Sequence, residues 1–433
     1  MRYPSFIERN FDFPRFYRVT VHRSEKSLDS PEKTLTEPLD RAIATSGIRR
    51  GHRVAVGVGS RGIDRLPELV ALLCARLRGV GADPFIVPAM GSHGGATAAG
   101  QIKVLEHLGI TEETAGAPVA SSLAVRRVGT VRTDVPVFYS ADALAADHSV
   151  FINRIKPHTK FKAEVESGLF KMLCVGMGQH EGALAFHDHA LLHGFAPLLR
   201  EMAGMLLART NVRFGLAVVE NGRDRLFHVE PVTADRMANR EPELLEMAKA
   251  QFPRLPVSEA DLLVIGRIGK EISGAGMDPN VTGRAFDLKE SDFSGDFHAT
   301  RVVLLRLSEK GGNAIGLGNA DIVTERIFQE MNYEATLMNA LTSRSLHKAF
   351  IPIRMPTEAK AIQAGFTTLG PIPPASVRAI LIRDTMHLDD IWVSEALRGG
   401  LLPLEDVTVR EPVDVQFDDG GVLVQPDLFG AKD

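Results

Sequence analysis

The chain has 433 residues, of which 44% are hydrophobic and 24% charged, and its formal net charge is −4. This length exceeds one ordinary core, so we expect two domains, and the small net charge gives no reason to expect nucleic acid or an anionic membrane as a partner. Cys74 and Cys174 lie in apolar segments, which suits a reducing compartment and excludes a disulfide framework. The N-terminus lacks the apolar core of a signal peptide and no apolar run could cross a bilayer, so we expect a cytoplasmic protein.

Two strand–loop–helix units come first. Residues 53–58 (RVAVGV) predict a buried strand, followed by the glycine loop GSRG and a helix at about 66–77. Residues 85–90 (FIVPAM) predict a second strand, followed by the loop GSHGG and a helix at about 97–108. This alternation predicts a parallel sheet covered by helices, with ligands bound at the carboxyl ends of its strands.

Further elements complete the first predicted domain. Residues 149–155 predict another strand, and residues 182–208 predict one long helix. Residues 213–232 predict a hairpin that turns at Asn221-Gly222.

The polar segment 252–261 (FPRLPVSEAD) marks the expected domain boundary. We expect an N-terminal domain at 1–255 and a C-terminal domain at 256–404, which begins with the strand DLLVIGRIGK and has a later strand at 377–385. The tail 405–433 contains a final hairpin, VDVQFDDGGVLVQPDLF, which we expect to pack on the first domain. The expected fold class is α/β with two domains, each a mostly parallel sheet flanked by helices, and an active site in the cleft between them.

The first glycine loop matches a dinucleotide-binding spacing at Gly57, Gly59 and Gly62. Such a site also needs an acidic residue after the second strand, and AMGSHGG stands there instead, which argues against NAD. Free N–H groups in the loop would suit a single phosphate, with Arg61 adding a charge-assisted contact. An ordinary turn with a solvated arginine is the alternative.

Two histidines follow predicted strands, His93 in GSHGG and His158 in IKPHTKF. Imidazole suits proton transfer near neutral pH. Two histidines on adjacent loops could face a substrate from opposite sides, as a two-base racemase or epimerase requires. Each could also be an ordinary surface or core histidine.

The segment 151–173 (FINRIKPHTKFKAEVESGLFKML) gathers many charged groups directly after a strand, which predicts part of an active site. Lys171 lies in its apolar end, SGLFKML. It is either a snorkelling surface residue or a partly desolvated amine suited to covalent attachment.

His187, His189 and His193 share one predicted helix. The i, i+4 spacing of His189 and His193 is typical of zinc sites, but HALLH lacks the glutamate of the HExxH motif. A zinc-dependent hydrolase or lyase built on all three histidines is one alternative function, and helix histidines without a metal are another interpretation.

Taken together, AMGSHGG, IKPHTKF, ESGLFKMLCVGMGQHEGALAFH and GSRG resemble the nickel-dependent lactate racemase family, over most of the chain. The resemblance implies a racemase or epimerase of 2-hydroxy acids with a nickel-pincer nucleotide, the nickel complex of pyridinium-3-thioamide-5-thiocarboxylic acid mononucleotide. It implies that Lys171 is the covalent tether, that His187 is the nickel ligand, and that His93 and His158 are the acid and base. The further cofactor contacts that it implies are Gly59, Ser60, Arg61 and Ser167.

The chain departs from the lactate enzymes between His158 and Lys171, where its segment is longer and more polar. The polar residues are Lys160, Lys162, Glu164 and Glu166. Such a segment suits a substrate with extra hydroxyls or a second carboxylate, such as a sugar acid or a malate-like acid, with Arg154 and Lys160 as substrate-binding residues. A solvated strand edge would explain the same charges.

In the second domain, the loop 268–284 (IGKEISGAGMDPNVTGR) is rich in glycine and charge and follows a strand. We expect Lys270 to hold the substrate carboxylate, and an ordinary glycine-rich loop is the alternative. The possible neighbours of Lys270 are Glu271, Asp278, Asn280 and Arg284.

The expected partners are a small 2-hydroxy acid and the proteins that make the cofactor. Besides the zinc enzyme, a second alternative is a non-catalytic protein that binds the cofactor or an anionic metabolite.

Overall fold

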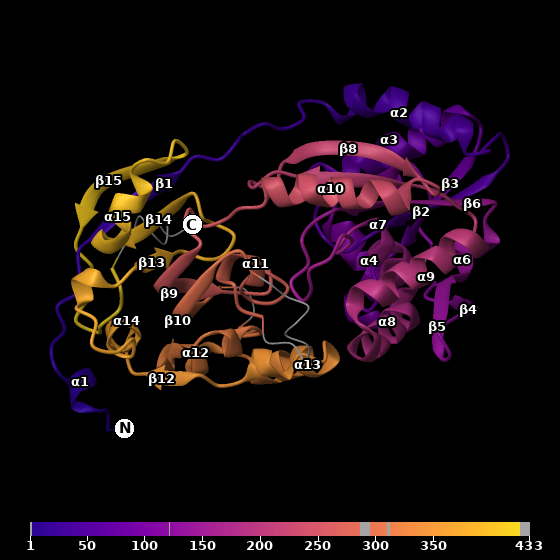
Figure 1. Ribbon diagram of the computed structural model, residues 1–433. Helices are drawn as coiled ribbons and strands as arrows, with labels where there is room; N and C mark the ends of the chain where they lie inside the picture. Colours follow the sequence, from indigo (N-terminus) through magenta and orange to yellow (C-terminus); the bar gives the residue numbers. More distant parts are fainter. Residues whose placement is uncertain (1, 121, 286–294, 310–311, 425–433) are drawn as a thin grey trace. The chain divides into compact units, whose positions relative to one another are not determined.

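The computed structural model describes residues 2–120, 122–285, 295–309 and 312–424. The chain forms two compact units (Figure 1): the N-terminal unit, residues 24–252, and the C-terminal unit, residues 1–23 together with 253–433. The predicted α/β class with two units is confirmed, and the boundary after residue 252 lies close to the expected one. The expected placement of the site between the units stays a prediction.

A five-stranded sheet forms the centre of the N-terminal unit, in the order β3-β2-β6-β7-β8. Its strands are β2 (Arg53–Val58), β3 (Asp83–Pro88), β6 (His148–Arg154), β7 (Val212–Glu220) and β8 (Leu226–Thr233). The first four strands in that order are parallel, and β8 pairs antiparallel with β7 through the expected hairpin. A separate antiparallel hairpin joins β4 (Val125–Val131) to β5 (Val135–Ser140). The mostly parallel sheet predicted for this part of the chain is therefore confirmed.

Helices cover both faces of this sheet, because its strands are apolar on both sides. Val54 and Val56 of β2 belong to the core formed with α2, α3 and α4, whereas Ala55 belongs to the core formed with α8, α9 and α10. The helices are α2 (Pro31–Thr45), α3 (Leu66–Gly79), η1 (Gly94–Ala96), α4 (Ala98–His107), α5 (Glu112–Ala115), α6 (Ala141–Ala145), α7 (Leu169–Lys171), the π-helix η2 (Met172–Gly176), α8 (Gln179–His193), α9 (Phe195–Arg209) and α10 (Met237–Gln251).

The long helix predicted at 182–208 is wrong, because two helices, α8 and α9, occupy this segment. The break is Gly194, whose φ of 80° belongs to the left-handed region that glycine adopts without a steric cost. The N–H of Gly194 still donates to the carbonyl of Ala190 at 2.9 Å, which closes the last turn of α8.

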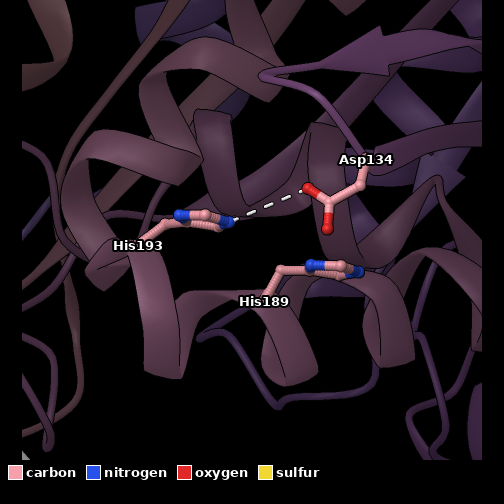
Figure 2. A group of neighbouring side chains, drawn as sticks. All are labelled: Asp134, His189 and His193. Atoms are coloured by element: carbon pink, nitrogen blue, oxygen red, sulfur yellow. Dashed lines mark ion pairs between the residues drawn. The ribbon is translucent and has the colours of Figure 1, made fainter.

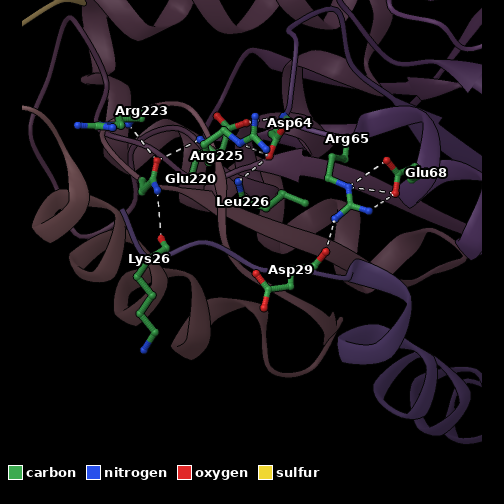
Figure 3. A network of polar contacts seen from close by, with 10 residues as sticks. Lys26, Asp29, Asp64, Arg65, Glu68, Glu220, Arg223, Arg225 and Leu226 are labelled. Carbon is green, nitrogen blue, oxygen red and sulfur yellow. Dashed lines mark hydrogen bonds and ion pairs between the residues drawn. The ribbon is translucent and has the colours of Figure 1, made fainter. Parts of the chain in front are cut away.

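A polar network fixes the loop after β2 to the β7–β8 hairpin (Figure 3). The N–H of Asp64 donates to Glu220 Oε1 at 2.6 Å, and Asp64 Oδ2 accepts from the N–H of Leu226 at 3.0 Å. Arg65 pairs with Glu68 and donates to the carbonyl of Asp29 at 3.0 Å. These contacts anchor the segment that follows the glycine loop GSRG.

The C-terminal unit contains an eight-stranded mixed sheet in the order β12-β11-β10-β9-β13-β14-β1-β15. The strands are β1 (Phe16–Val21), β9 (Glu259–Ile268), β10 (His298–Leu307), β11 (Ile322–Thr324), β12 (Ile353–Met355), β13 (Ala379–Ile382), β14 (Asp390–Ser394) and β15 (Val407–Val413). Strands β9 to β13 pair in parallel, and β14, β1 and β15 add antiparallel pairs. Helices and turns of this unit are α1 (Ser5–Glu8), α11 (Pro279–Thr282), η4 (Leu317–Asn319), α12 (Glu325–Glu330), α13 (Tyr333–Thr342), η5 (Leu346–Ala349), α14 (Glu358–Thr367), η6 (Pro374–Ser376) and α15 (Glu395–Leu401).

The two ends of the chain depart from the expected domains. Strand β1 pairs with β14 and β15, so the first residues belong to the C-terminal unit. The tail expected to pack on the first domain also belongs to the C-terminal unit, because β15 hydrogen-bonds to β1 and Leu423 is buried in that unit's core. Of the expected final hairpin, Phe417 and Leu423 form a single bridge, and residues 425–429 lie outside the described part of the chain.

Among the helices that the structure describes, none has both the length and the apolar character that a membrane crossing needs.

Candidate active site

The strand order brings three loops to one edge of the N-terminal sheet. Strand β2 lies between β3 and β6 and is parallel to both, so the loops that follow these three strands begin side by side. They carry Arg61, His93 and His158, respectively. Ser60 Oγ lies 2.7 Å from His93 Nδ1, which links the first two loops directly.

His158 and Lys171 are in direct contact, with 2.8 Å between His158 Nε2 and Lys171 Nζ. The other ring nitrogen, Nδ1, accepts the backbone N–H of Lys160 at 3.1 Å. A neutral imidazole that accepts at Nδ1 carries its proton on Nε2. His158 therefore presents an N–H to the lysine, and a neutral amine is the form of Lys171 that can accept it.

Burial lowers the pKa of the Lys171 ammonium from its ordinary value to about 7. Repulsion from neighbouring cations contributes, and these are Lys156, Arg61 and Lys160. A large fraction of the Lys171 side chains is therefore uncharged near neutral pH, and an uncharged amine is a nucleophile. Of the two interpretations of Lys171 given by the sequence, the geometry favours the desolvated amine over the snorkelling surface residue.

An unusual backbone segment holds Lys171 in place. Lys171 is the last residue of α7, and the π-helix η2 follows at once, with the N–H of Met177 donating to the carbonyl of Met172 at 2.8 Å. Single π-helical turns occur frequently at functional sites. A side chain at Gly59 would place its Cβ 2.9 Å from Met172 Cε, so the glycine allows the loop after β2 to approach this segment.

Glu166 supports His158 from the protein interior, with only 1% of its surface exposed. Its Oε2 accepts the backbone N–H of His158 at 2.7 Å, and its Oε1 accepts the N–H of Ala163 at 3.2 Å. Lys249 of α10 forms an ion pair with Oε1 at 3.2 Å. Glu166 is therefore neither part of a solvated strand edge nor a substrate contact, and it positions the loop that carries His158.

Glu241 of α10 supports the start of α7. Gly168, the residue before α7, offers no side-chain cap, and Glu241 Oε2 accepts the N–H of Phe170 at 2.9 Å instead. Burial raises the pKa of Glu241 to about 8, although the N–H groups of Phe170 and Leu169 act to lower it. Glu241 Oε2 can accept the N–H of Phe170 whether or not the acid is protonated, so this hydrogen bond helps to fix the short helix that ends at Lys171.

His187 is half-buried on α8, and burial lowers the pKa of its imidazole to about 3. Repulsion from Lys160 and Lys171 contributes, which indicates that His187 lies near both lysines. A neutral imidazole is the form that binds metals. His187 is therefore neutral near pH 7, and its role as a metal ligand stays a prediction.

The three-histidine zinc site considered from the sequence does not form. His189 and His193 approach Asp134, and the ligand atoms of these three residues lie within 4.8 Å of one another (Figure 2). His187 is not part of that group and is coupled to Lys160 and Lys171 instead. The reason is helical geometry: residues four apart share a face, whereas His187 precedes His189 by two positions.

Aromatic rings connect the two ends of the candidate site. The His158 ring lies 4.5 Å from the ring of Phe161, which stacks on Phe195 at 5.3 Å. Phe186, the neighbour of His187, contacts Phe195 edge to face at 6.1 Å. Lys160 Nζ lies over the Phe195 ring at 5.7 Å. These rings remove water from one side of the imidazoles and Lys160.

The remaining predicted residues have other contacts. Arg154 forms an ion pair with Glu220, which also holds the loop after β2. Ser167 exchanges backbone hydrogen bonds with Lys156, which closes the His158 loop at its base. Lys270 lies in the C-terminal unit, where its Nζ donates to Asn339 Oδ1 at 2.5 Å. The roles of Arg154, Ser167 and Lys270 in binding stay predictions.

Three residues near the site were not assigned roles from the sequence. Lys156 lies close enough to Lys171 to shift its pKa, and KPH was a signal that could have drawn attention to it. Asn153 donates from Nδ2 to the carbonyl of Gly168 at 2.6 Å and so ties β6 to α7. Glu241 comes from a helix some seventy positions further along the chain, and nothing in the local sequence indicates its contact with α7.

The sequence matches no protein-family model and no curated protein. Among solved structures, the chain is similar to the lactate racemase apoprotein from Thermoanaerobacterium thermosaccharolyticum, with 14% identity and a TM-score of 0.48 over 91% of this chain and 97% of that one. An identity of 14% assigns neither a family nor a substrate to this chain.

Proposed function

We propose that this protein is a racemase or epimerase acting at C2 of a 2-hydroxy acid, with a nickel-pincer nucleotide attached to Lys171. The observation that carries the proposal is the Lys171 amine, whose pKa is lowered to about 7 and which lies 2.8 Å from His158. A lysine of this kind is suited to covalent attachment. The ammonium group of an ordinary surface lysine would stay charged and hydrated near neutral pH.

The residues around Lys171 match the chemistry of that cofactor. Arg61, Lys156 and Lys160 supply positive charge beside Lys171, which suits a phosphate and a thiocarboxylate arm. The neutral imidazole of His187 suits a nickel ion. Arg61 and Ser60 would hold the phosphate, Lys171 the ring through a covalent bond, and His187 the metal.

When bound, the cofactor would supply the acceptor and donor for the hydrogen at C2. The two histidines would manage the hydroxyl proton, because each is placed on a loop at the same sheet edge. One histidine would take the hydroxyl proton as the 2-hydroxy acid becomes a 2-keto acid. After the keto acid has rotated to present its other face, the second histidine would donate a proton of its own to the keto oxygen. Glu166 would keep His158 in position throughout.

We further propose that the substrate is more polar than lactate. Lys156 and Lys160 add two cations beside the tether, so the site could hold a second carboxylate. A malate-like diacid or a sugar acid would place an additional carboxylate or hydroxyl groups near these cations, whereas the methyl group of lactate would gain nothing from them. The cytoplasmic location and a role for cofactor-biosynthesis proteins are part of the same proposal.

The test uses protein co-expressed with a cofactor-biosynthesis pathway and incubated in D2O with single enantiomers of lactate, malate and several sugar acids. Chiral chromatography should show the opposite configuration at C2 for a polar acid, with no deuterium gained at C2. Lys171→Met should abolish the reaction, and Lys103→Met, on the exposed side of α4, should leave it unchanged. Inversion that persists in Lys171→Met, or deuterium at C2, would contradict the proposal.

A further inference from the structure

Asp134, His189 and His193 form a cluster that the proposed reaction does not use (Figure 2). We propose that this cluster is a second metal site, which binds one divalent transition-metal ion of the zinc class. Two imidazoles and one carboxylate are a ligand set that zinc accepts, with water at the open position. Calcium and magnesium prefer oxygen ligands and would not suit two imidazoles.

Two elements supply the ligands. His189 and His193 lie one turn apart on α8, with their rings parallel to within 3° and their centroids 6.2 Å apart. Asp134 comes from the turn between β4 and β5, and its Oδ1 lies 4.0 Å from His193 Nε2. Strand β5 packs against α8, so the hairpin and the helix already meet without a metal.

Two ring nitrogens at the cluster have no hydrogen bond within the described part of the chain, although both are removed from water: His189 Nδ1 and His193 Nε2. A buried nitrogen without a partner costs free energy. His193 Nε2 is the atom that faces Asp134, so a metal ion there would satisfy it.

The spacing is close to what zinc needs. Bonds of about 2.0–2.2 Å in a tetrahedral site place neighbouring ligand atoms roughly 3.4 Å apart. The three ligand atoms lie within 4.8 Å of one another, so the cluster must contract by up to about 1.4 Å on binding. Asp134 can supply this movement, because 61% of its side chain is exposed on a turn.

Arg132 affects how strongly the cluster binds a metal ion. Its Nη1 lies 3.2 Å from His193 Nδ1 while Glu201 holds the guanidinium through two hydrogen bonds of 2.9 and 2.8 Å. A guanidinium only donates, so this contact requires the lone pair of Nδ1 and leaves the proton on Nε2. Metal binding at Nε2 moves that proton to Nδ1 and ends the Arg132 contact. Arg132 therefore opposes the metal, and Arg132→Gln, which offers an oxygen acceptor, should strengthen binding.

The metal would fasten the β4–β5 hairpin to α8, the helix that also carries His187. This second site is independent of the proposed cofactor, because it shares no ligand with Lys171 or His187. Binding of the ion should stabilise the packing of the β4–β5 hairpin on α8 against local unfolding.

The experiment uses the untagged full-length protein, produced without the cofactor pathway, stripped with a chelator and titrated with Zn2+ by calorimetry. Wild type should bind about one zinc ion, and Asp134→Asn and His193→Gln should each weaken it by about 10-fold or more, since even indirect ligand supports are worth that much. Asp188→Asn, on the same helix, and His187→Asn should bind zinc as wild type does. Cobalt substitution should give the absorption bands of a four-coordinate site with nitrogen and oxygen ligands.

Wild-type affinity in both Asp134→Asn and His193→Gln, or no zinc bound by wild type, would overturn the proposal. Loss of binding in His187→Asn alone would place the ion at the proposed nickel ligand and would also overturn it. Asp134 is an exposed turn residue, so its variant tests the site even if His193→Gln fails to fold.

Discussion

Lys171 has a strongly perturbed environment, because burial and the nearby cations both act against the charged form of its amine. Its folded pKa of about 7 lies below its ordinary value of 10.5, so the unfolded chain binds more protons between about pH 7 and 10.5. The free energy of unfolding of the wild type should therefore rise with pH across this window. It should decrease as pH falls toward 7, because the unfolded chain takes up a proton that the buried amine does not.

The first prediction concerns Lys171→Met, which keeps the length of the side chain and removes the charge. The difference in unfolding free energy between wild type and variant should shift in favour of wild type by on the order of 3 kcal/mol from pH 7 to pH 10.5. Urea unfolding at several pH values measures it, with Lys103→Met as the control. An equal difference at both pH values would show that Lys171 is an ordinary solvated lysine.

The second prediction is that Glu166 contributes more to stability than Glu164, which lies two positions earlier in the same segment. Glu166→Gln breaks a buried ion pair with Lys249 and weakens the support of His158, so it should cost about 3–5 kcal/mol. Glu164→Gln removes an ion pair with Arg200 from a side chain that is 79% exposed, so it should cost under about 1 kcal/mol. Equal losses of stability in the two variants, measured by thermal unfolding, would contradict a positioning role for Glu166.

At this scale the sequence showed which residue types gather after β6 but not which of them are buried. Glu164 and Glu166 have the same chemistry and lie two positions apart. Their difference depends on Lys249, from a helix far along the chain. Histidine placement was easier to predict, because His93 and His158 follow strands whose apolar runs are plain in the sequence.

At the scale of elements, the junction from Gly168 to the π-helix sets the position of Lys171. A Cβ at Gly168 would lie 2.2 Å from Glu241 Oε1 and 2.6 Å from Ile155 Cδ1. The third prediction is that Gly168→Ala displaces Glu241, uncaps α7 and costs about 1–3 kcal/mol of stability.

The matched control is Gly204→Ala on α9, where an added Cβ meets no atom within 4 Å. This change should stabilise the protein by about 0.5–1 kcal/mol, because alanine is the better helix former. Chemical denaturation of both variants measures these changes in unfolding free energy. A neutral Gly168→Ala would show that the junction adapts without loss.

Strands and most helices were predictable at this scale, because their apolar periodicity is local. The π-helix was not, since its sequence MLCVG carries no distinct signal. The break at Gly194 was indicated only by one glycine in a helical pattern, which a continuous helix could also tolerate at a modest cost.

At the scale of the molecule, the chain crosses from one unit to the other twice. Strand β1 joins the sheet of the C-terminal unit, and the chain then builds the whole N-terminal unit before it returns after residue 252. The sequence boundary near 255 was predictable from a polar, proline-containing segment. The pairing of β1 with β14 and β15 was not, because it joins segments several hundred residues apart.

The fourth prediction follows from this division. A fragment of residues 24–252 should fold cooperatively on its own, because it contains a complete sheet with both faces covered. A fragment of residues 1–255 should keep that fold but leave residues 1–23 unstructured, because the partners of β1 are absent. Circular dichroism and amide NMR spectra report both results, and an unfolded 24–252 fragment would contradict the division.

The central claim is that Lys171 carries a nickel-pincer nucleotide. The most direct measurement is intact and peptide mass spectrometry with nickel analysis, on the full chain co-expressed with a cofactor-biosynthesis pathway that loads a lactate racemase control. We predict an adduct that maps to Lys171, about one nickel ion per chain, and loss of the nickel but not of the adduct in His187→Asn. An unmodified Lys171, alongside a control that loads normally, would contradict the claim.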